Sequence, residues 1–582
     1  MDCTAAYDLA NEKVFDYIIV GGGTAGLVLA ARLTEDPSVQ VVVLEAGEKR
    51  LDDPQINIPG LMTTLYSDSK YDWNFHTTPQ PSLNNRTLHW PRGKLLGGTS
   101  AINFLMATHA SRLDLDNWET LGNPGWNFDA LQPYYRKSET FTSVSEVVAK
   151  ELHTSVFEKG LHGDSGPLKT SFPKGMGSLD AAWPQAFKTL GLGAERDPRE
   201  GEVLGGYNLL KYMDGDAKRS YAASAYYAPN EGRENLTVLT GAFVKKIEFE
   251  KVDGEGVVSA RGSPQILELS GVGGRERLEG LGIEILVDNP DVGENLQDHP
   301  LIGFAYEALD GIPTKEMIKQ PGVLEWAMEE YTSKGSGPLA GGLLEEAPTS
   351  TNPGLKKQLQ LQTELLLNDK EADLQFNFGA TGMNPHAGND VSQFFEHSDA
   401  GGYAGITTVL THAFSRGSIH IQSSDPTVHP IIDPCYLTHP LDIEILISGL
   451  LFTQTIASTS PLSSLLNDNN PGDGKRTQLS FSIPGRLTRE TALGLVRNSS
   501  ATSFHPVGTC SMLPRDDGGV VDCRLRVYGV RGLRVVDASV VPLNVRGNIA
   551  SAVYAVAEKA ADMIREDRAG LLVSGYVSVG RG

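Results

Sequence analysis

The alternation of apolar and polar positions near the start of the chain predicts a strand, a helix and a second strand in close succession. Residues 15–20 (FDYIIV) are largely apolar and rich in β-branched and aromatic side chains, as in a short buried strand. Residues 27–33 (LVLAARL) continue as an apolar helix, and residues 39–44 (VQVVVL) form a second β-branched run. This order is typical of a βαβ unit with parallel strands.

A glycine turn joins the first strand to the helix. Gly21, Gly23 and Gly26 have the GxGxxG spacing that lets the backbone approach a pyrophosphate, whose charge the helix N-terminus stabilises. Glu45 follows the second strand at about the 20-residue distance expected of an acid that binds an adenosine ribose. The sequence therefore predicts a dinucleotide site, and this acid disfavours the 2′-phosphate of NADP.

Further elements are predicted along the rest of the chain. Residues 532–537 (GLRVVD) are predicted to form a buried strand that ends in an acid, and residues 549–564 a helix rich in alanine. A second glycine turn lies at residues 92–100 (RGKLLGGTS), and it is either a second anion-binding nest or a plain loop. Residues 300–500 instead contain glycine- and proline-rich joints, mixed helices and amphipathic strands.

A chain of 582 residues exceeds what one hydrophobic core supports. We expect an α/β fold in which a discontinuous, Rossmann-like nucleotide-binding domain carries an inserted α+β substrate-binding domain. Residues 14–300 would form mostly the nucleotide-binding domain, with some insertions of the substrate domain. Residues 301–500 would form the substrate-binding domain, and residues 501–566 would return to the first domain.

Charge and composition narrow the range of partners and locations. The net charge of −22 disfavours nucleic acid and anionic membranes. We expect no membrane span, because the chain has no run of about 18 apolar residues. The first residues lack the basic and apolar regions of a signal peptide, so we expect a cytoplasmic protein, or a secreted one if the N-terminus is misannotated. The four cysteines have no metal-ligand spacing, which predicts no metal site.

Further motifs follow one another along nearly the whole chain, from about residue 14 to residue 566. In this order they resemble the glucose-methanol-choline (GMC) family of FAD-dependent oxidoreductases, with aryl-alcohol oxidase-like and choline dehydrogenase-like members. The resemblance implies a Rossmann-like FAD-binding domain and redox chemistry on a CH–OH group. The motifs are residues 17–26 with Glu45, 72–75 (DWNF), 92–103 (RGKLLGGTSAIN), 263–273 (SPQILELSGVG), 292–299 (VGENLQDH), 503–510 (SFHPVGTC) and 533–548.

The resemblance implies FAD as the cofactor and assigns residues to it. The first glycine turn would hold the pyrophosphate, Glu45 the adenosine ribose and the backbone of Val244 the adenine. The second glycine turn would line the flavin, and the segment at Asp537 the ribityl phosphate. Some members attach FAD to a histidine at the position of Ile102, so we expect non-covalent FAD. The implied FAD-binding residues are Gly21, Gly23, Thr24, Ala25, Gly26, Glu45, Gly98, Thr99, Asn103, Val244, Asp537 and Ala538.

The catalytic pair of the family matches His505 and Asn548. Pro506 disfavours the α region for His505, which suits a turn that presents the ring to a cleft. A histidine with an ordinary pKa of about 6.5 can accept a hydroxyl proton near neutral pH. The resemblance implies that His505 deprotonates a small organic alcohol while hydride passes to flavin N5, with Asn548 bound to the alcohol oxygen. Asn548 also precedes the predicted helix at residues 549–564 and could simply cap it.

Two alternative functions stay open. Hydroxynitrile lyases share this fold and use flavin only structurally. An inactive paralogue or a mis-spliced gene model would explain why the family's strands are shortened between residues 250 and 263. The motifs leave open the substrate, an aromatic alcohol or a secondary-metabolite intermediate, and the acceptor, O2 or a quinone. His299 and His412 are interpreted as structural.

Overall fold

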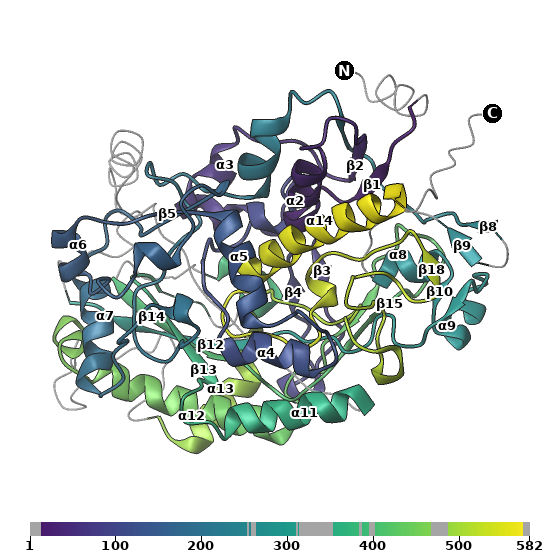
Figure 1. The fold of residues 1–582 in the computed structure, drawn as a ribbon. Coiled ribbons are helices and arrows are strands. Elements are labelled where there is room, and N and C mark those ends of the chain that lie inside the picture. Colours follow the sequence, from purple (N-terminus) through teal and green to yellow (C-terminus); the bar gives the residue numbers. More distant parts are fainter. Residues whose placement is uncertain are drawn as a thin grey trace.

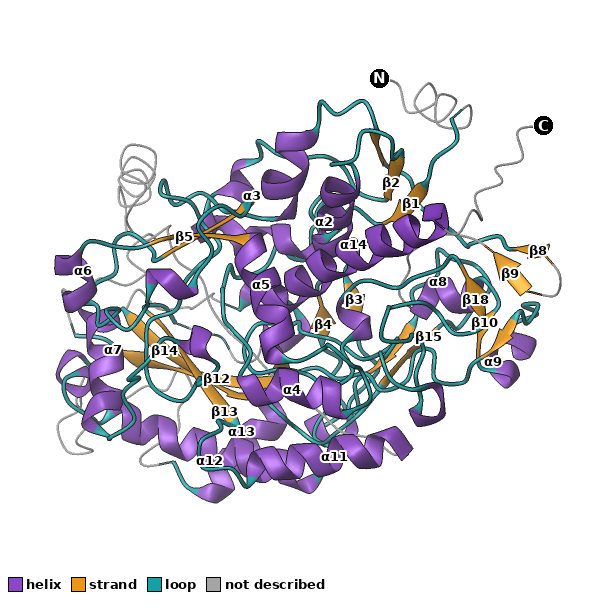
Figure 2. Cartoon of the chain, viewed as in Figure 1, coloured by secondary structure: helices purple, strands orange, loops and turns teal. Residues whose placement is uncertain are grey.

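The computed structural model describes residues 13–252, 255–257, 264–309, 312, 353–382, 384, 387–394, 402–466 and 487–573 (Figures 1 and 2). The helices are α2 (Thr24–Leu33), α3 (Pro54–Asn57), α4 (Arg112–Thr120), α5 (Phe128–Ser138), α6 (Glu146–Glu151), α7 (Ser178–Thr189), α8 (Pro264–Leu269), α9 (Arg275–Gly280), α11 (Pro353–Leu366), α12 (Pro440–Ala457), α13 (Arg489–Ser499) and α14 (Ala550–Val573). The strands are β1 (Tyr17–Val20), β2 (Val41–Glu45), β3 (Phe75–His76), β4 (His89–Trp90), β5 (Glu139–Thr142), β6 (Leu168–Ser171), β7 (Leu236–Thr240), β8 (Glu250–Val252), β9 (Glu255–Val257), β10 (Val272–Gly273), β11 (Val287–Asp288), β12 (Pro300–Glu307), β13 (Leu374–Gly379), β14 (Tyr403–Leu410), β15 (Ser418–His420), β16 (Ile431–Asp433), β17 (Ala501–Thr502) and β18 (Val530–Arg531).

The N-terminal βαβ unit has the predicted parallel arrangement. β1 pairs with β2, with Tyr17 opposite Val41, and β7 extends the sheet in the order β1-β2-β7. The connecting helix α2 is buried continuously from Ala25 to Ala31, because nearly every residue of this stretch is apolar. The predicted succession of strand, helix and strand is therefore confirmed.

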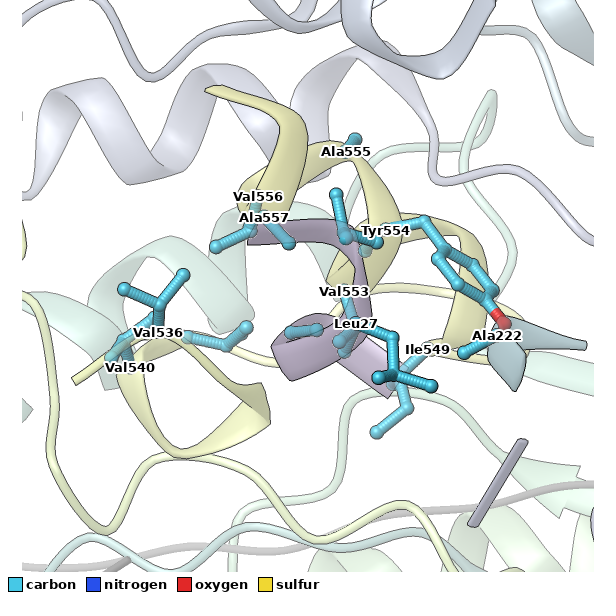
Figure 3. Packing of buried hydrophobic residues seen from close by; sticks show 14 of the residues in the cluster. Leu27, Ala222, Val536, Val540, Ile549, Val553, Tyr554, Ala555, Val556 and Ala557 are labelled. Atoms are coloured by element: carbon cyan, nitrogen blue, oxygen red, sulfur yellow. The ribbon is translucent and has the colours of Figure 1, made fainter. Parts of the chain in front are cut away.

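The C-terminal helix α14 packs against α2 and α5 and completes the first hydrophobic core (Figures 1 and 3). Leu27 of α2 and Val553 of α14 belong to this core. Ala555 and Ala557 are fully buried, and such small side chains allow close packing of the helix. The predicted alanine-rich helix is confirmed and extends beyond residue 564. The two ends of the chain thus meet in one core.

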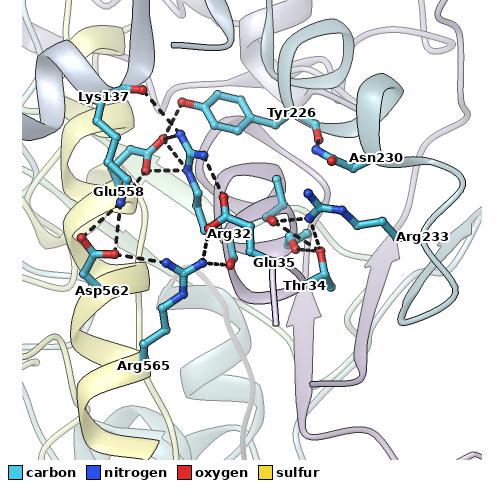
Figure 4. A network of polar contacts seen from close by, with 12 residues as sticks. Arg32, Thr34, Glu35, Lys137, Tyr226, Asn230, Arg233, Glu558, Asp562 and Arg565 are labelled. Atoms are coloured by element: carbon cyan, nitrogen blue, oxygen red, sulfur yellow. Dashed lines mark hydrogen bonds and ion pairs between the residues drawn. The ribbon is translucent and has the colours of Figure 1, made fainter. Parts of the chain in front are cut away.

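One buried carboxylate of α14 forms polar contacts with side chains of α2 and α5 and so links the three helices (Figure 4). Glu558 of α14 has no exposed surface and accepts from Nε and Nη2 of Arg32 on α2, both at 2.8 Å. Lys137 of α5 lies 3.4 Å from the same carboxylate, and Tyr226 Oη donates to it at 2.9 Å. The contacts satisfy the buried charge and fix the position of α2.

Residues 532–537 do not form the predicted strand. The nearest strand, β18, ends before them, and the segment makes only an isolated antiparallel bridge, between Arg534 and Arg526, with both of its valines buried. Asp537 then begins a one-turn helix, Ala538–Val540, in which Ser539 N donates to the aspartate Oδ1 at 2.8 Å. Burial was predicted correctly, but pairing depends on neighbours that the local pattern does not identify.

A second sheet lies apart from the first and is antiparallel throughout, in the order β13-β14-β12-β17. α12 packs on β14 and α13. Its 18 residues, with a mean hydropathy of 1.3, are long and apolar enough to cross a membrane by length and composition alone. Leu446 and Leu450 of α12 are fully buried in the second core, so we interpret it as a core helix.

The segment between residues 250 and 263 is described only in part. β8 and β9 form a short hairpin, and β18 adds a third strand parallel to β9. Residues 253–254 and 258–263 lie outside the described part of the chain. The predicted shortening of the family's strands here stays a prediction, as do the domain boundaries.

Candidate active site

Two glycine turns meet at the N-terminus of α2 and form a backbone cradle. Gly21 has a φ of +96°, which favours glycine, and turns the chain from β1 toward α2. Gly97 N donates to Gly22 O at 2.8 Å. A Cβ on Gly98 would lie 2.8 Å from the Cα of Gly23, so the turns touch with no room for a side chain. The second turn therefore lies directly on the first, where its backbone can serve the same ligand.

The first turn of α2 adds hydrogen-bond donors to this cradle. Thr24, Ala25 and Gly26 follow Gly23, which is the N-cap residue of the helix. The first N–H groups of a helix lack partners within the helix and can bind an anion. The cradle is thus suited to a diphosphate.

Glu45 lies at the end of β2 with its carboxylate at the same turn. Its Oε2 accepts from Gly22 N at 2.8 Å and its Oε1 from Gly47 N at 2.7 Å. Burial raises the pKa of Glu45, although both backbone bonds act against that rise. Each carboxylate oxygen retains a lone pair that a ribose hydroxyl can use.

Thr99 and Asn103 shape the wall beside the second glycine turn. Thr99 Oγ1 accepts from Gly93 N at 3.2 Å. Asn103 Oδ1 accepts from Leu105 N at 3.0 Å and from Arg219 Nη1 at 2.8 Å. These oxygens hold the loop in place.

The other residues assigned to FAD lie at the edges of the cradle. Val244 is half-buried beyond β7, and Ala242 N donates to Glu45 O at 2.8 Å, which brings this segment beside the end of β2. Asp537 and Ala538 are partly exposed, and the carboxylate of Asp537 bonds within its own helical turn. In the described part of the chain, no hydrogen bond joins Asp537 to the glycine turns.

His505 and Asn548 lie side by side. Nε2 of His505 is 3.3 Å from Nδ2 of Asn548, and the two residues are 9% and 8% exposed. Thr108 Oγ1 donates to the backbone oxygen of Asn548 at 3.1 Å, just before α14 begins. A helix cap uses the amide oxygen of asparagine, whereas the contact with His505 uses the amide nitrogen. The predicted catalytic pair is thus brought together, and a capping role does not conflict with it.

Asp298 fixes the backbone of His505. Its Oδ1 accepts from His505 N at 2.9 Å, and its Oδ2 accepts from Thr502 Oγ1 at 2.5 Å and from Tyr436 Oη. Burial raises the pKa of Asp298, whereas these donors favour the carboxylate. Because these three groups all donate hydrogen bonds to it, the carboxylate of Asp298 holds the backbone of His505 as an acceptor.

Phe504 and its neighbours connect the histidine loop to the cradle. Phe504 has a φ of +71°, a strained conformation for a bulky residue, and its carbonyl accepts from Arg92 Nη1 at 3.3 Å. Its ring stacks on Tyr66 and Phe104, with centroids 6.3 and 6.1 Å away. Tyr66 Oη donates to Ile102 O at 2.7 Å. These three rings, the aromatic trio, form an apolar cluster that includes the residue before His505.

The environment of His505 keeps its ring neutral. Burial, together with the positive charge of Arg92, lowers the pKa of His505 to about 3. The ordinary value of about 6.5 expected from the sequence does not hold, because the sequence did not indicate burial of this depth. The neutral ring is the form that accepts a proton.

Of the two histidines that were interpreted as structural, His299 contacts the pair and His412 contacts Asp114. His299 Nδ1 is 3.2 Å from His505 Nδ1. His412 Nε2 is 2.9 Å from Asp114 Oδ1, and Arg546 donates to both oxygens of the same carboxylate at 3.0 and 3.1 Å. This cluster anchors the loop that precedes Asn548. His299 could have been noticed from its place in the VGENLQDH motif. Its approach to His505 depends on long-range pairing, of β12 with β17 and of Gln297 with Val507.

The chain is similar to known oxidoreductases along nearly its whole length. Two models described as GMC oxidoreductase match residues 15–262 and 413–557. The dehydrogenase citC of Monascus ruber is 36% identical over 622 residues, which cover 96% of this chain and 97% of that protein. The oxygen-dependent choline dehydrogenase of Acinetobacter baumannii is 32% identical over 585 residues, covering 95% and 97%. An FAD-dependent oxidoreductase from Chaetomium thermophilum has a TM-score of 0.78 at 28% identity, covering 95% of this chain and all of that one.

A parallel βαβ unit with touching glycine turns and an acid at the end of its second strand is typical of the nucleotide-binding α/β class of proteins. The chain belongs to the GMC oxidoreductase family, whose members depend on FAD. The predicted α/β fold, with an FAD-binding domain and a substrate domain, is confirmed. The residues present fit FAD: the touching glycine turns admit only backbone at the diphosphate position, and Glu45 offers oxygens to a ribose.

Proposed function

We propose that this protein oxidises the CH–OH group of a small organic alcohol with FAD. The observation that carries the proposal is the 3.3 Å contact of His505 Nε2 with Asn548 Nδ2, in a buried site that Tyr66 connects to the glycine cradle. The cradle and Glu45 would hold FAD, which supplies a hydride acceptor, flavin N5, when it is bound.

In this proposal the neutral ring of His505 accepts the hydroxyl proton at Nε2. Asn548 Nδ2 donates to the alcohol oxygen and orients the carbon that loses hydride. An alcohol oxygen between the two nitrogens would satisfy both of them, because Nε2 accepts and the amide donates. Negative charge that develops on this oxygen stabilises the buried imidazolium, which offsets the low pKa of the free ring.

The aromatic trio supports an aromatic or otherwise apolar alcohol as the substrate. Such a substrate would include intermediates of secondary metabolism that carry aromatic rings. The reduced flavin would pass its electrons to O2 or to a quinone. The name of the oxygen-dependent relative from Acinetobacter baumannii supports O2.

We further propose that FAD is bound non-covalently. Ile102 is buried at the end of the second glycine turn and has no nucleophilic atom with which to form a bond to a flavin. Acid precipitation of the yellow protein is expected to release all the flavin into the supernatant. Flavin that stays with the precipitate would contradict this.

The first test is the visible spectrum of the purified protein under anaerobic conditions. Benzyl alcohol, 4-methoxybenzyl alcohol and choline are added in turn, and bleaching of the flavin bands by one of them supports the proposal. A yellow protein that none of them bleaches, but that releases cyanide from mandelonitrile, would be a hydroxynitrile lyase instead. A colourless protein would show that the chain does not hold FAD, which would fit an inactive paralogue.

A further inference from the structure

The ring of His505 is contacted on both of its nitrogens. Asn548 Nδ2 lies 3.3 Å from Nε2, and His299 Nδ1 lies 3.2 Å from Nδ1. The two imidazole planes meet at 80°, with centroids 5.4 Å apart, so the contact is made in edge-on fashion. His299 is fully buried, directly before β12.

The tautomers of His505 and His299 follow from which atoms donate and which accept in these two contacts, with Nδ2 of Asn548 facing the ring. An amide nitrogen carries only donors, so Nε2 of His505 must accept from Asn548. A neutral ring then carries its proton on Nδ1, which donates to Nδ1 of His299, and the proton of His299 is on its Nε2. Burial lowers the pKa of both histidines, which agrees with two neutral rings.

We propose that His299 is a positioning residue that holds His505 in the tautomer whose Nε2 carries no proton and can accept one. The proposal rests on His505 acting as the base of the proposed oxidation. Nδ1 of His299 accepts a hydrogen bond from Nδ1–H of His505 while the His505 ring is neutral. It accepts the same hydrogen bond once the His505 ring is charged.

The adjacent residue does not fill this role. The carboxylate of Asp298 accepts from the backbone of His505 and from Thr502 and Tyr436. Asp298 therefore holds the backbone, whereas His299 holds the ring. A neutral acceptor at Nδ1 leaves the charge around the site unchanged, and Arg92 remains the cation that acts on His505.

The direct test is the protonation of each ring nitrogen, measured by 15N NMR on FAD-loaded protein labelled with 15N-histidine. His505→Gln identifies the signals of His505. We expect wild-type His505 to carry its proton on Nδ1 and His299→Asn to keep it there, because the amide oxygen can replace the lost acceptor. His299→Phe leaves Nδ1 without an acceptor and should move the proton toward Nε2, with the amide of Asn548 turned so that its oxygen accepts there. His109→Phe is the matched control, because His109 is also buried with a pKa of about 3, and its ring contacts Tyr135 instead.

A kinetic measurement adds a second readout. With 4-methoxybenzyl alcohol, His299→Phe should reduce the rate constant of flavin reduction by roughly ten- to a hundredfold, the loss expected of a hydrogen bond to a charged group. The apparent Kd of the alcohol and the FAD content should stay near wild type, and His299→Asn should restore most of the rate.

Two results would overturn the proposal: a wild-type His505 with its proton on Nε2, or a proton position that His299→Phe does not change. A wild-type proton on Nε2 overturns the proposal even if the phenylalanine variant does not fold, and a wild-type proton on Nδ1 supports it only together with the shift in His299→Phe. Failure of the oxidation itself is distinguishable, because the tautomer is measured without any substrate.

Discussion

His505 is held at three points by three different residues. Asp298 binds its backbone nitrogen, His299 its Nδ1 and Asn548 its Nε2. A ring fixed in this way has one orientation, which a base needs if a proton is to pass over a short distance. The depth of burial that provides these contacts also lowers the pKa of His505 to about 3.

Replacement of His505 by alanine tests its role as the base. His505→Ala should keep FAD and the thermal unfolding temperature, because Asp298 bonds to the backbone nitrogen that remains. The rate of anaerobic flavin reduction by an alcohol should fall by at least about a hundredfold, the usual contribution of a general base. His429→Ala, at an exposed histidine, is the control and should reduce flavin at the wild-type rate. Undiminished reduction in His505→Ala would rule out the base assignment.

At the level of elements, the two glycine turns must touch for the cradle to exist. Gly98→Ala would place a Cβ 2.8 Å from the backbone of Gly23, at a φ of +52° that alanine resists. We expect the variant to purify with much less FAD, measured by the fluorescence of flavin released on heating. Gly280→Ala is the matched control, because a Cβ there has nothing within 4 Å, and its FAD content should be normal. A fully loaded Gly98→Ala protein would show that the turns can separate without loss of the site.

The packing of α14 on α2 depends on a buried charge. Glu558→Gln would remove the fully buried carboxylate that Arg32 and Lys137 share, although both cations are partly exposed and keep a second acidic partner. The loss of charge-assisted hydrogen bonds to Arg32 should cost about 2 kcal/mol. Glu566→Gln, on the same helix, breaks an ion pair with Arg524 in which the glutamate is 66% exposed, and should cost less than about 1 kcal/mol. Denaturant unfolding of the two FAD-loaded variants measures the difference. Equal losses would mean that the buried network does not stabilise the helix pair.

The sequence predicted the secondary-structure elements of this site better than the tertiary contacts between them. The βαβ unit and the alanine-rich α14 follow from local periodicity, and the motifs led to His505 and Asn548. The contact of His299 with His505 depends on β12 pairing with β17, a long-range choice that local patterns do not encode. Residues 532–537 were predicted as a strand, but their backbone pairs with residues 525–527 only at an isolated bridge, and the local pattern does not encode how far such pairing extends.

At the scale of the whole molecule, His162 and His420 each lie between two carboxylates from segments that are distant in the sequence. His162 lies 3.2 Å from Glu139 and 3.0 Å from Asp197. His420 lies 2.8 Å from both Glu268 and Glu294. Burial alone would lower the pKa of each histidine, but the hydrogen bonds to carboxylates outweigh burial and raise it. The charged histidines therefore stabilise the folded protein.

The sign of this linkage predicts how stability changes with pH. A folded-state pKa raised above about 6.5 gives stability that is fully present below that pH and lost as the pH rises through the folded value. Glu139 acts in the opposite sense: burial would raise its pKa, but Arg199 and His162 lower it to about 2, so its contribution is lost only toward that pH. Buried neutral histidines such as His505 and His109, whose pKa of about 3 lies below the unfolded value, act in the opposite sense to the charged ones and lose their contribution as the pH falls below about 6.5. The unfolding temperature of the FAD-loaded protein should therefore be highest near pH 6.5 and fall on both sides.

His162→Gln isolates one of these charges. It should lower the unfolding temperature at pH 6 by several degrees and flatten the decline between about pH 6.5 and 9, because glutamine cannot carry the proton that the two carboxylates stabilise. His109→Gln is the control, since His109, with a pKa of about 3, is already neutral throughout this range and its loss should leave the decline above about pH 6.5 unchanged. If the unfolding temperature declines as steeply in His162→Gln as in the wild type, other groups cause the pH dependence. His420 is then the next residue to replace, because its imidazole also lies between two carboxylates.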